Sequence, residues 1–379
     1  MKNKKKLLKR RQVLIGATAL TAATGLLASC KENVDGGTPD NPSKSSAISK
    51  EIIEWKMVTT WPKNFPGLGT GAQRIADSIT AMSDGQLNVK LYAGGELVPP
   101  FECFDAVSQG TAQMSHGASY YWINKNRSMP FFATVPGGLT AQEHDAWIHY
   151  GGGQELWDEL YAEFNLKGFL GGNSGVQMGG WFKKEINTLN DFKGLKMRMP
   201  GLGAEVINRM GATAISLPGG EIMPALESGA IDATEWVGPY NDLAFGFYQA
   251  TKYYYGPGFH EPGTHTECMV NKKEYDSLPK NLQKIVEHAC VSENNRMLAE
   301  FTRGNSAAQR KLINEHGVII NNFPKEVYNT MFKLSEEVVA ETANEGEINK
   351  RIYNSWIKFK EDVRERAPFA EQGYMERRG

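Results

Sequence analysis

The sequence predicts an α/β fold with a mostly parallel sheet, and three observations support this prediction. Strand-like and helix-like segments alternate from residue 52 onward, as they do in chains of βαβ units. A pattern of helix end, glycine and strand occurs twice, at residues 107–115 and 226–234. Residues 278–366 contain few glycines and prolines and show apolar residues at helical spacing. The repeat suits two similar lobes that face one cleft, although such junctions are common enough to recur by chance.

Length and composition describe an ordinary globular protein. The 379 residues provide for two domains, since about 150 residues per domain is usual. Hydrophobic residues make up 41% of the chain and charged residues 22%, and the formal net charge is −1. Domains that bind nucleic acid are normally strongly basic, so this charge balance predicts no nucleic-acid partner.

The first thirty residues have the organisation of a bacterial export signal. A basic segment, 2–11, precedes an uncharged apolar segment, 13–28, which is shorter than the roughly 20 residues of a membrane-spanning helix. The signal ends in Leu27-Ala28-Ser29-Cys30, which resembles a bacterial lipobox. We therefore predict a lipoprotein-type signal peptide over residues 1–29 and lipidation of Cys30. An ordinary signal followed by a chance cysteine is the alternative.

The sequence signals for the export route and for the segment after the signal peptide are less specific. Arg10-Arg11 partly matches a twin-arginine signal, and a plain basic region is the alternative. Residues 30–50 are rich in Gly, Pro, Ser, Asn and Asp, which predicts a flexible tether. An odd number of cysteines then remains, which leaves at least one thiol unpaired in an oxidising compartment. We expect all three to be buried structural residues: Cys103, Cys268 and Cys290.

The beginning of the mature chain predicts a β-α-β-α-β succession. The first helix has one apolar face and ends at Ser83-Asp84-Gly85. The expected elements are a strand at 52–60, a helix at 67–82, a strand at 87–92, a short helix at 101–108 and a strand at 113–116. Crossover helices between strands imply parallel strand neighbours.

A second unit of the same kind is expected to follow. Residues 140–164 predict one long helix, and residues 169–174 predict the first strand of this second unit. The further expected elements are strands at 194–199, 213–217 and 230–234, helices at 203–210, 221–227 and 244–253, and a returning strand at 267–271. The helical region 278–366 ends in an amphipathic helix that suits packing on the body of the protein or on a partner.

Two glutamates are the candidate cation ligands. Glu235-Trp236 directly follows the strand at 230–234, and strand ends in open α/β sheets are where ligands bind. Glu261 lies in the glycine-rich loop that starts at Gly256. If the two carboxylates converge, they supply the hard oxygen ligands that Na⁺ or Ca²⁺ prefers. The alternative is that each is a solvated surface carboxylate.

Arg198 and Gln177 are the candidate contacts to an organic ligand. Arg198 lies between two methionines at a strand end, where its guanidinium group could meet a carboxylate in two-pronged fashion. A solvated arginine on an edge strand is the alternative. Gln177 is an amide among glycines after a strand, and glycines let a backbone approach a ligand closely.

The sequence shows no motif of a known enzyme class, such as GxSxG, HExxH or a P-loop. The histidines show no ligand spacing, and we interpret His260 as solvated or packed. A secreted metal-dependent enzyme with Glu235 or Glu261 as general base is a weaker alternative, because only His260 offers a catalytic partner.

These residues lie in segments that resemble the extracytoplasmic solute receptors of TRAP (tripartite ATP-independent periplasmic) transporters. The resemblance runs from about residue 55 to beyond residue 275, and it is closest to the subgroup that binds 2-oxo acids together with a cation. The segments that carry it are Thr60-Trp61-Pro62-Lys63, Tyr120-Tyr121-Trp122, 175–182, Arg198-Met199-Pro200-Gly201, 226–232, 235–239 and Gly258-Phe259-His260-Glu261.

The resemblance implies a two-lobed periplasmic-binding-protein fold, type II-like, with lobes joined by a long helix and hinge strands and with a helical C-terminus. Lobe 1 is expected to comprise residues 51–140 with part of 232–265. Lobe 2 is expected to comprise residues 141–231 with part of 266–320. Residues 321–379 would form the C-terminal helical segment, and a long helix there can mediate homodimers in this subgroup.

The resemblance also implies roles for individual residues. Arg198 would pair with the ligand carboxylate, and Gln177 would touch both the ligand and the cation. Glu235, the main-chain carbonyl of Trp236 and Glu261 would complete the cation shell, which would hold Na⁺ or Ca²⁺. Tyr120 and Tyr121 are expected ligand contacts from lobe 1.

The expected function is that of a periplasmic, lipid-anchored receptor. It would capture a small 2-oxo monocarboxylate such as pyruvate together with the cation and deliver it to the TRAP membrane subunits. Another organic acid, such as lactate, a dicarboxylate or a sugar acid, is the alternative ligand. A second arginine in the cleft would favour a dicarboxylate or a sugar acid, and Arg127 is the candidate for that role.

Overall fold

The computed structural model describes residues 51–378 of the chain. The predicted signal peptide, the tether and the lipidation site Cys30 lie outside these residues. Within residues 51–378, no helix is both long enough and apolar enough to cross a membrane.

The first sheet has five strands in the order β2-β1-β3-β10-β4. Its strands are β1 (Ile53–Thr59), β2 (Leu87–Tyr92), β3 (Met114–Gly117), β4 (Leu166–Asn173) and β10 (His265–Asn271). Strand β1 pairs in parallel with β2 and β3, whereas β10 pairs antiparallel with both β3 and β4. One strand of this sheet therefore runs against the others.

The second sheet has six strands in the order β11-β9-β5-β8-β6-β7. Its strands are β5 (Gly180–Phe182), β6 (Lys196–Arg198), β7 (Thr213–Ile215), β8 (Ala233–Thr234), β9 (Tyr253–Tyr255) and β11 (Ile319–Asn321). Strand β5 is antiparallel to its two neighbours, and the other pairings are parallel. The predicted α/β class with mostly parallel sheets is confirmed.

The chain passes directly from one sheet to the other at two loops, which we call the crossovers. The first crossover, 174–179, joins β4 to β5, and the second, 256–264, joins β9 to β10. Each reversed strand, β5 and β10, comes immediately after a crossover.

The sheet membership of two strands corrects the sequence analysis. The segments at 169–174 and 267–271 were expected in the second unit, but both β4 and β10 belong to the first sheet. Both strands are almost entirely buried, so their sequences carry no alternation that could show which sheet they join.

The helices before the second sheet are α1 (Leu68–Met82), α2 (Cys103–Ser108), α3 (Ala141–Tyr150) and α4 (Gly153–Ala162). The single long helix predicted at 140–164 is wrong, because the chain turns at Gly151-Gly152 between α3 and α4. Gly152 has a φ of 86°, which is left-handed and readily adopted only by glycine.

The helices of the second sheet are α5 (Gly201–Arg209), α6 (Gly219–Ser228) and α7 (Pro239–Phe245). The helix predicted at 244–253 is also wrong. Helix α7 ends at Gly246, where φ is 78°, and a short 3₁₀ turn leads into β9. The aromatic run Tyr253-Tyr254-Tyr255 favours a strand, and the structure has the strand β9 at these residues instead of the end of the predicted helix.

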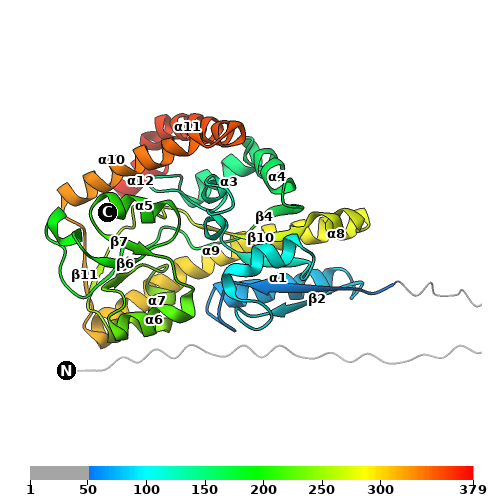
Figure 1. Ribbon diagram of the computed structural model, residues 1–379, viewed down its shortest axis with the longest axis horizontal. Coiled ribbons are helices and arrows are strands. Elements are labelled where there is room, and N and C mark those ends of the chain that lie inside the picture. The colour runs from blue at the N-terminus through cyan, green and yellow to red at the C-terminus, as the bar shows by residue number, and fades with distance from the viewer. Residues whose placement is uncertain (1–50, 379) are drawn as a thin grey trace, which may run out of the picture. The chain divides into compact units, whose positions relative to one another are not determined.

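One long helix packs both on the first sheet and on a helix that follows a strand of the second sheet. After the short α8 (Lys272–Ser277), α9 (Lys280–His316) packs on β4, β10 and α1 and also on α7 (Figure 1). Its close approach to β4 depends on Gly172. A Cβ atom at that position would lie 2.4 Å from Thr266 Oγ1 and 2.5 Å from the Met297 side chain. The predicted long connecting helix is therefore present.

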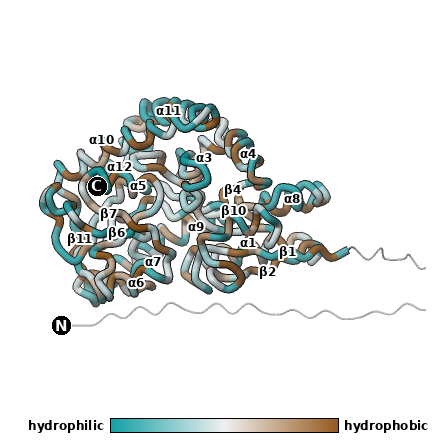
Figure 2. Tube along the Cα trace, viewed as in Figure 1, coloured by the Kyte–Doolittle hydropathy of each residue, from teal (hydrophilic) through white to brown (hydrophobic). Residues whose placement is uncertain are grey.

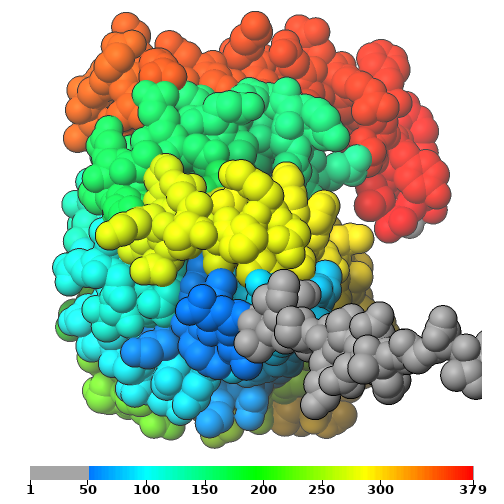
Figure 3. Space-filling view, turned by 90° about the vertical axis from the view of Figure 1, so that its right-hand side faces the viewer, coloured from blue at the N-terminus to red at the C-terminus, as the bar shows by residue number. Residues whose placement is uncertain are grey.

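The C-terminal region is helical, as predicted, and consists of α10 (Lys325–Glu341), α11 (Glu347–Arg366) and α12 (Glu371–Arg377). Helix α10 packs on α5, and α11 packs on α3 and α4. The space-filling view shows these helices, in orange and red, lying against the green part of the chain (Figure 3).

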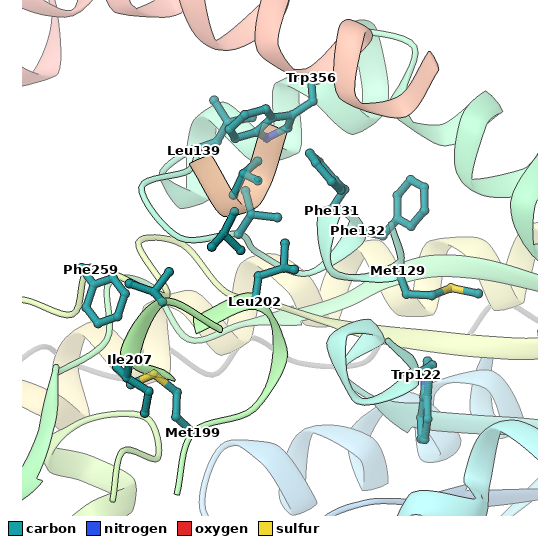
Figure 4. Close-up of a cluster of buried hydrophobic side chains, with 14 of the residues drawn as sticks. Trp122, Met129, Phe131, Phe132, Leu139, Met199, Leu202, Ile207, Phe259 and Trp356 are labelled. Atoms are coloured by element: carbon teal, nitrogen blue, oxygen red, sulfur yellow. The ribbon is translucent and has the colours of Figure 1, made fainter. Parts of the chain in front are cut away.

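Helix α11 consists largely of hydrophilic residues (Figure 2), and its buried residues include two large apolar ones, Ile352 and Trp356. Trp356 reaches from α11 toward Leu139 and Phe131 in the core (Figure 4), and its ring centroid lies 5.4 Å from that of Phe131. Ile352 is also buried on this side. The amphipathic pattern thus fixes α11 to the body of the protein.

Candidate ligand and cation site

The two crossovers and the ends of two strands of the second sheet meet at one place. Gln177 lies on the first crossover, and His260 and Glu261 lie on the second. Arg198 ends β6, and Glu235 directly follows β8. The Gln177 N–H donates to the Glu261 carbonyl at 3.1 Å, which ties the crossovers together. The structure therefore assembles the predicted residues from four separate segments.

A buried ion pair between Arg198 and Glu235 forms the centre of this site. Their side chains are 1% and 0% exposed, so the solvated alternatives for both residues are excluded. The Arg198 Nη1 group also donates to the Glu235 carbonyl at 3.3 Å, and Nε donates to the Leu217 carbonyl at 3.2 Å. The Nη2 group has a weaker contact, 3.5 Å from the Tyr121 hydroxyl. The Nη2 end of the guanidinium thus retains capacity for another acceptor.

The environment of Arg198 maintains its positive charge. Burial lowers the pKa of Arg198, but the negative charge of Glu235, followed by the nearby tyrosines and Glu261, outweighs burial and raises it. The guanidinium carbon also lies 5.1 Å from the centre of the Trp236 ring, a cation–π distance. The site therefore presents a permanent cation to any anionic ligand.

Glu261 is the second buried carboxylate of the site. Its Oε2 accepts a hydrogen bond from Thr264 Oγ1 at 2.7 Å. Burial, followed by the nearby negative charge of Glu235, raises the pKa of Glu261 to about 7. A positive ion between the two carboxylates would oppose both effects.

His260 belongs to the site, which the sequence analysis did not predict. Its ring is buried, and its Nε2 lies 3.3 Å from Glu235 Oε2. Its Nδ1 has no hydrogen-bond partner among residues 51–378. The only sequence signal was its position beside Glu261 in the same loop.

The oxygen atoms of the site fit a hard cation. Candidate ligand atoms of Glu235, His260 and Glu261 all lie within 4.8 Å of one another. Gln177 donates its Nε2 to Ser174 Oγ at 3.1 Å, and its Oε1 is buried without a partner in the described part of the chain. A buried acceptor without a donor is costly unless an ion or a ligand satisfies it. Carboxylate, amide and carbonyl oxygens are the ligands that Ca²⁺ and similar cations take.

Two small pockets open beside these residues, and Tyr120 lines both. One is also lined by Trp61, Tyr121, Gln177 and Trp236, and the other by His260 and Glu261. The rings of Trp61 and Trp236 meet edge to face, with centroids 6.1 Å apart. Tyr120 and Tyr121 thus lie at the site, as predicted, and Trp61 joins them as an aromatic wall that was not predicted.

Arg127 lies elsewhere and does not provide a second arginine for the site. Its guanidinium forms ion pairs with Glu205 and, at 3.3 Å, with Glu345. These partners belong to α5 and to the turn before α11.

A family model matches residues 57–345, and its description is bacterial extracellular solute-binding protein, family 7 (DctP). The chain belongs to this family. A monocarboxylate 2-oxoacid-binding periplasmic protein of Nostoc sp. strain PCC 7120 is 39% identical over 359 residues, which cover 94% of this chain and 95% of that protein. The predicted resemblance is therefore confirmed at the level of the family.

Solved structures of DctP-family proteins share the fold. A TRAP periplasmic solute-binding protein from Pseudoalteromonas atlantica, with bound sodium and pyruvate, is 42% identical with a TM-score of 0.84, covering 87% of this chain and 100% of that chain. A TRAP transporter solute-binding protein from Bordetella bronchiseptica, a dimer with calcium and picolinate in one site, is 39% identical with a TM-score of 0.84. The match covers 86% of this chain and 97% of that chain. The predicted two-lobed periplasmic-binding fold is confirmed.

Proposed function

We propose that this DctP-family protein captures a small 2-oxo monocarboxylate together with Na⁺ or Ca²⁺ and delivers it to TRAP membrane subunits. The observation that carries the proposal is the convergence of Arg198, two buried carboxylates and the unpartnered Gln177 Oε1 in one small site. The Pseudoalteromonas relative, with pyruvate and sodium, supports the class of ligand and of cation.

Each residue has a separate task in this proposal. The Nη2 end of Arg198 binds the ligand carboxylate, and Gln177 Oε1 serves the cation and the ligand. Glu235, Glu261 and the Trp236 carbonyl hold the cation, which would bind the carboxylate and keto oxygens of a 2-oxo acid. Tyr120 and Tyr121 enclose the organic part. No bond is made or broken, and the binding energy comes from contacts in a water-poor site.

Calorimetric titration tests the proposal. The purified protein is titrated with pyruvate, 2-oxobutyrate and lactate in NaCl, in CaCl₂ and in choline chloride after treatment with a chelator. We expect 2-oxo acids to bind only when Na⁺ or Ca²⁺ is present, and lactate to bind more weakly because it lacks the keto oxygen. The proposal would be falsified if no organic acid bound under any of these conditions.

The size and charge of the site favour a monocarboxylate over the alternative acids. The two pockets that Tyr120 lines are small, and Arg127 is paired with Glu205 and Glu345. A dicarboxylate or a sugar acid would need a second cationic partner or more room. Mass spectrometry of the ligand retained by protein purified without dialysis would identify the acid directly.

A metal-dependent enzyme remains the second candidate, and the position of His260 beside both glutamates is the observation that favours it. It would need an open metal position and an activated water molecule. Incubation of pyruvate with the protein and Ca²⁺, followed by mass spectrometry, separates the candidates. A receptor returns the acid unchanged.

We further propose that Cys30 carries a lipid that anchors the protein on the periplasmic side and that the protein forms a homodimer through its C-terminal helices. The dimeric Bordetella relative supports dimer formation. Intact-mass analysis of protein from bacterial membranes tests the lipid, with Cys30→Ser as control. Light scattering of the mature protein with and without Phe369→Glu, a substitution of an exposed residue in the C-terminal helical region, tests the dimer.

A further inference from the structure

The main chain directly behind Trp236 is held by the buried side chain of Asp242 on α7. Asp242 Oδ1 accepts the N–H groups of Val237 at 3.3 Å and of Gly238 at 3.1 Å. Its other oxygen, Oδ2, accepts from Trp181 Nε1 at 2.8 Å and from the Tyr254 hydroxyl at 2.6 Å. The residue is 1% exposed, so water does not compete for these four bonds.

Because the peptide group is rigid, the hydrogen bonds to Asp242 also fix the direction of the Trp236 carbonyl. In a trans peptide the C=O and N–H groups lie in one plane and point in opposite directions. The bond between Trp236 and Val237 is trans. Because the Val237 N–H points at Asp242, the Trp236 C=O must point away from Asp242. In residues 51–378, no main-chain N–H in a turn or loop is bonded to that carbonyl.

The next peptide group is fixed in the same way. The Gly238 N–H points at Asp242, and the Val237 carbonyl accepts the Met178 N–H at 3.0 Å from the first crossover. Two successive peptide planes after Glu235 therefore have a defined orientation. The loop cannot rotate the Trp236 carbonyl without breaking hydrogen bonds to Asp242.

Asp242 itself is held by the second sheet. Trp181 on β5 and Tyr254 on β9 stack with ring centroids 4.0 Å apart, and both donate to Oδ2. Hydrogen bonds to a carboxylate are roughly twice as strong as bonds between neutral groups. The carboxylate thus links a rigid aromatic pair to the loop.

We propose that Asp242 is a positioning residue of the cation site, which sets the direction of the Trp236 carbonyl without touching the cation. The proposal rests on the proposed function, because it assigns this carbonyl to the cation. Residues that orient metal ligands typically change metal affinity by about 10–100-fold when they are replaced.

The test compares three variants by titration of NaCl and of CaCl₂ at saturating pyruvate, at about pH 8.5. This pH lies above the pKa of Asp242, which burial raises to about 7. Asp242→Ala removes the acceptor of both N–H groups, and Asp242→Asn replaces it with a weaker, neutral one. Tyr254→Phe is the matched control, because it removes a bond to Oδ2 and leaves both bonds to Oδ1 in place.

We expect cation affinity to fall at least about tenfold in Asp242→Ala and by a smaller factor in Asp242→Asn, while Tyr254→Phe binds like the wild type. If Asp242→Ala fails to fold, the comparison of Asp242→Asn with Tyr254→Phe decides. Equal cation affinity in those two variants would overturn the positioning role. Wild-type protein that binds neither cation nor pyruvate would overturn the proposed function itself.

Discussion

Arg198 and Glu235 place two opposite charges where water is absent, and this has energetic consequences beyond ligand binding. Moving charges out of water is costly, and only their mutual attraction and further hydrogen bonds offset that cost. Arg198 meets this condition with bonds to two main-chain carbonyls as well as to Glu235. Each charge therefore offsets the cost of burying the other, so substitutions of Arg198 or Glu235 affect the stability of the protein as well as its affinity for the ligand.

Glu235→Gln is expected to abolish cation-dependent binding and also to destabilise the protein by roughly 3–5 kcal/mol, because Arg198 loses its buried partner. Urea unfolding and calorimetry measure the two effects. Glu205→Gln is the matched control, since Glu205 pairs with the partly exposed Arg127. It should cost less than about 1 kcal/mol and leave binding intact. Normal binding by Glu235→Gln would contradict the assigned role.

Glu267 gives stability a pH dependence that is independent of the site. Burial raises its pKa to about 7 although Tyr161 and Trp122 donate to it. The folded protein then holds a proton that the unfolded chain releases above about pH 4.5, so stability falls as pH rises from about 4.5 to about 7.

We expect Glu267→Gln to reduce this loss by up to about 1.4 kcal/mol per pH unit, the slope for one proton. Urea unfolding at several pH values between 4.5 and 7.5 provides the measurement. A variant whose stability still fell as steeply as that of the wild type would refute the assignment to Glu267.

At the scale of elements, the packing of α9 on β4 depends on a missing side chain. Gly172→Ala would place a Cβ atom against Thr266 and Met297, and such overpacking typically costs about 1–3 kcal/mol. Gly220→Ala is the control, because a Cβ there meets no atom within 4 Å, and in α6 it should be neutral or stabilising by up to about 1 kcal/mol. Similar melting temperatures for the two variants would contradict this account.

The C-terminal helix α11 is attached mainly by buried apolar residues. Trp356→Ala should destabilise the protein by about 3–5 kcal/mol, because a large core side chain leaves a cavity. Phe369→Ala serves as the control, since Phe369 is 92% exposed. Thermal unfolding measures the loss of stability in both variants. An equally large loss in Phe369→Ala would contradict the assignment of Trp356 as a main attachment of α11.

Periodicity identified most elements, and its failures have physical causes. The strand at 87–92 and helix α1 were predicted nearly to the residue, because their alternating or helical patterns face solvent on one side. The break at Gly152 and the strand β9 were missed. The break depends on a single left-handed residue, and at β9 the predicted helix was extended beyond Gly246 into the aromatic run at 253–255, whose residue types favour a strand. Strands β4 and β10 are buried on both faces, so their sequences lack the alternation of polar and apolar residues that could have indicated their sheet.

At the scale of the whole molecule, the site was predicted through residue combinations and not through geometry. Arg198, Gln177, Glu235 and Glu261 were named in advance, and the structure brings them together. His260, Trp61 and Asp242 were missed, because a buried histidine and a carboxylate that holds a loop carry no local pattern. Their roles depend on contacts between segments that are far apart in sequence.

The described cysteines report on the stability of the whole protein. Cys103, Cys268 and Cys290 are all buried, as predicted, and burial raises the pKa of Cys103 to about 12. Their labelling by a thiol reagent should therefore require unfolding. Pyruvate with its cation at about 100 times Kd should slow labelling about 100-fold. Peptide mapping by mass spectrometry follows each thiol, and labelling unaffected by ligand would indicate local opening.

The crossovers also determine when each half of the protein can be completed as the chain is synthesised. Strand β10 lies between β3 and β4, yet about ninety residues separate it from β4 and about 150 from β3 along the chain. Until it arrives, β3 and β4 each present an unpaired edge, and such edges invite aggregation. The second sheet in turn waits for β11 near residue 320. The first sheet therefore cannot be completed until the chain has passed through β5 to β9 of the second sheet, and a chain cut short before β10 would leave the edges of β3 and β4 unpaired.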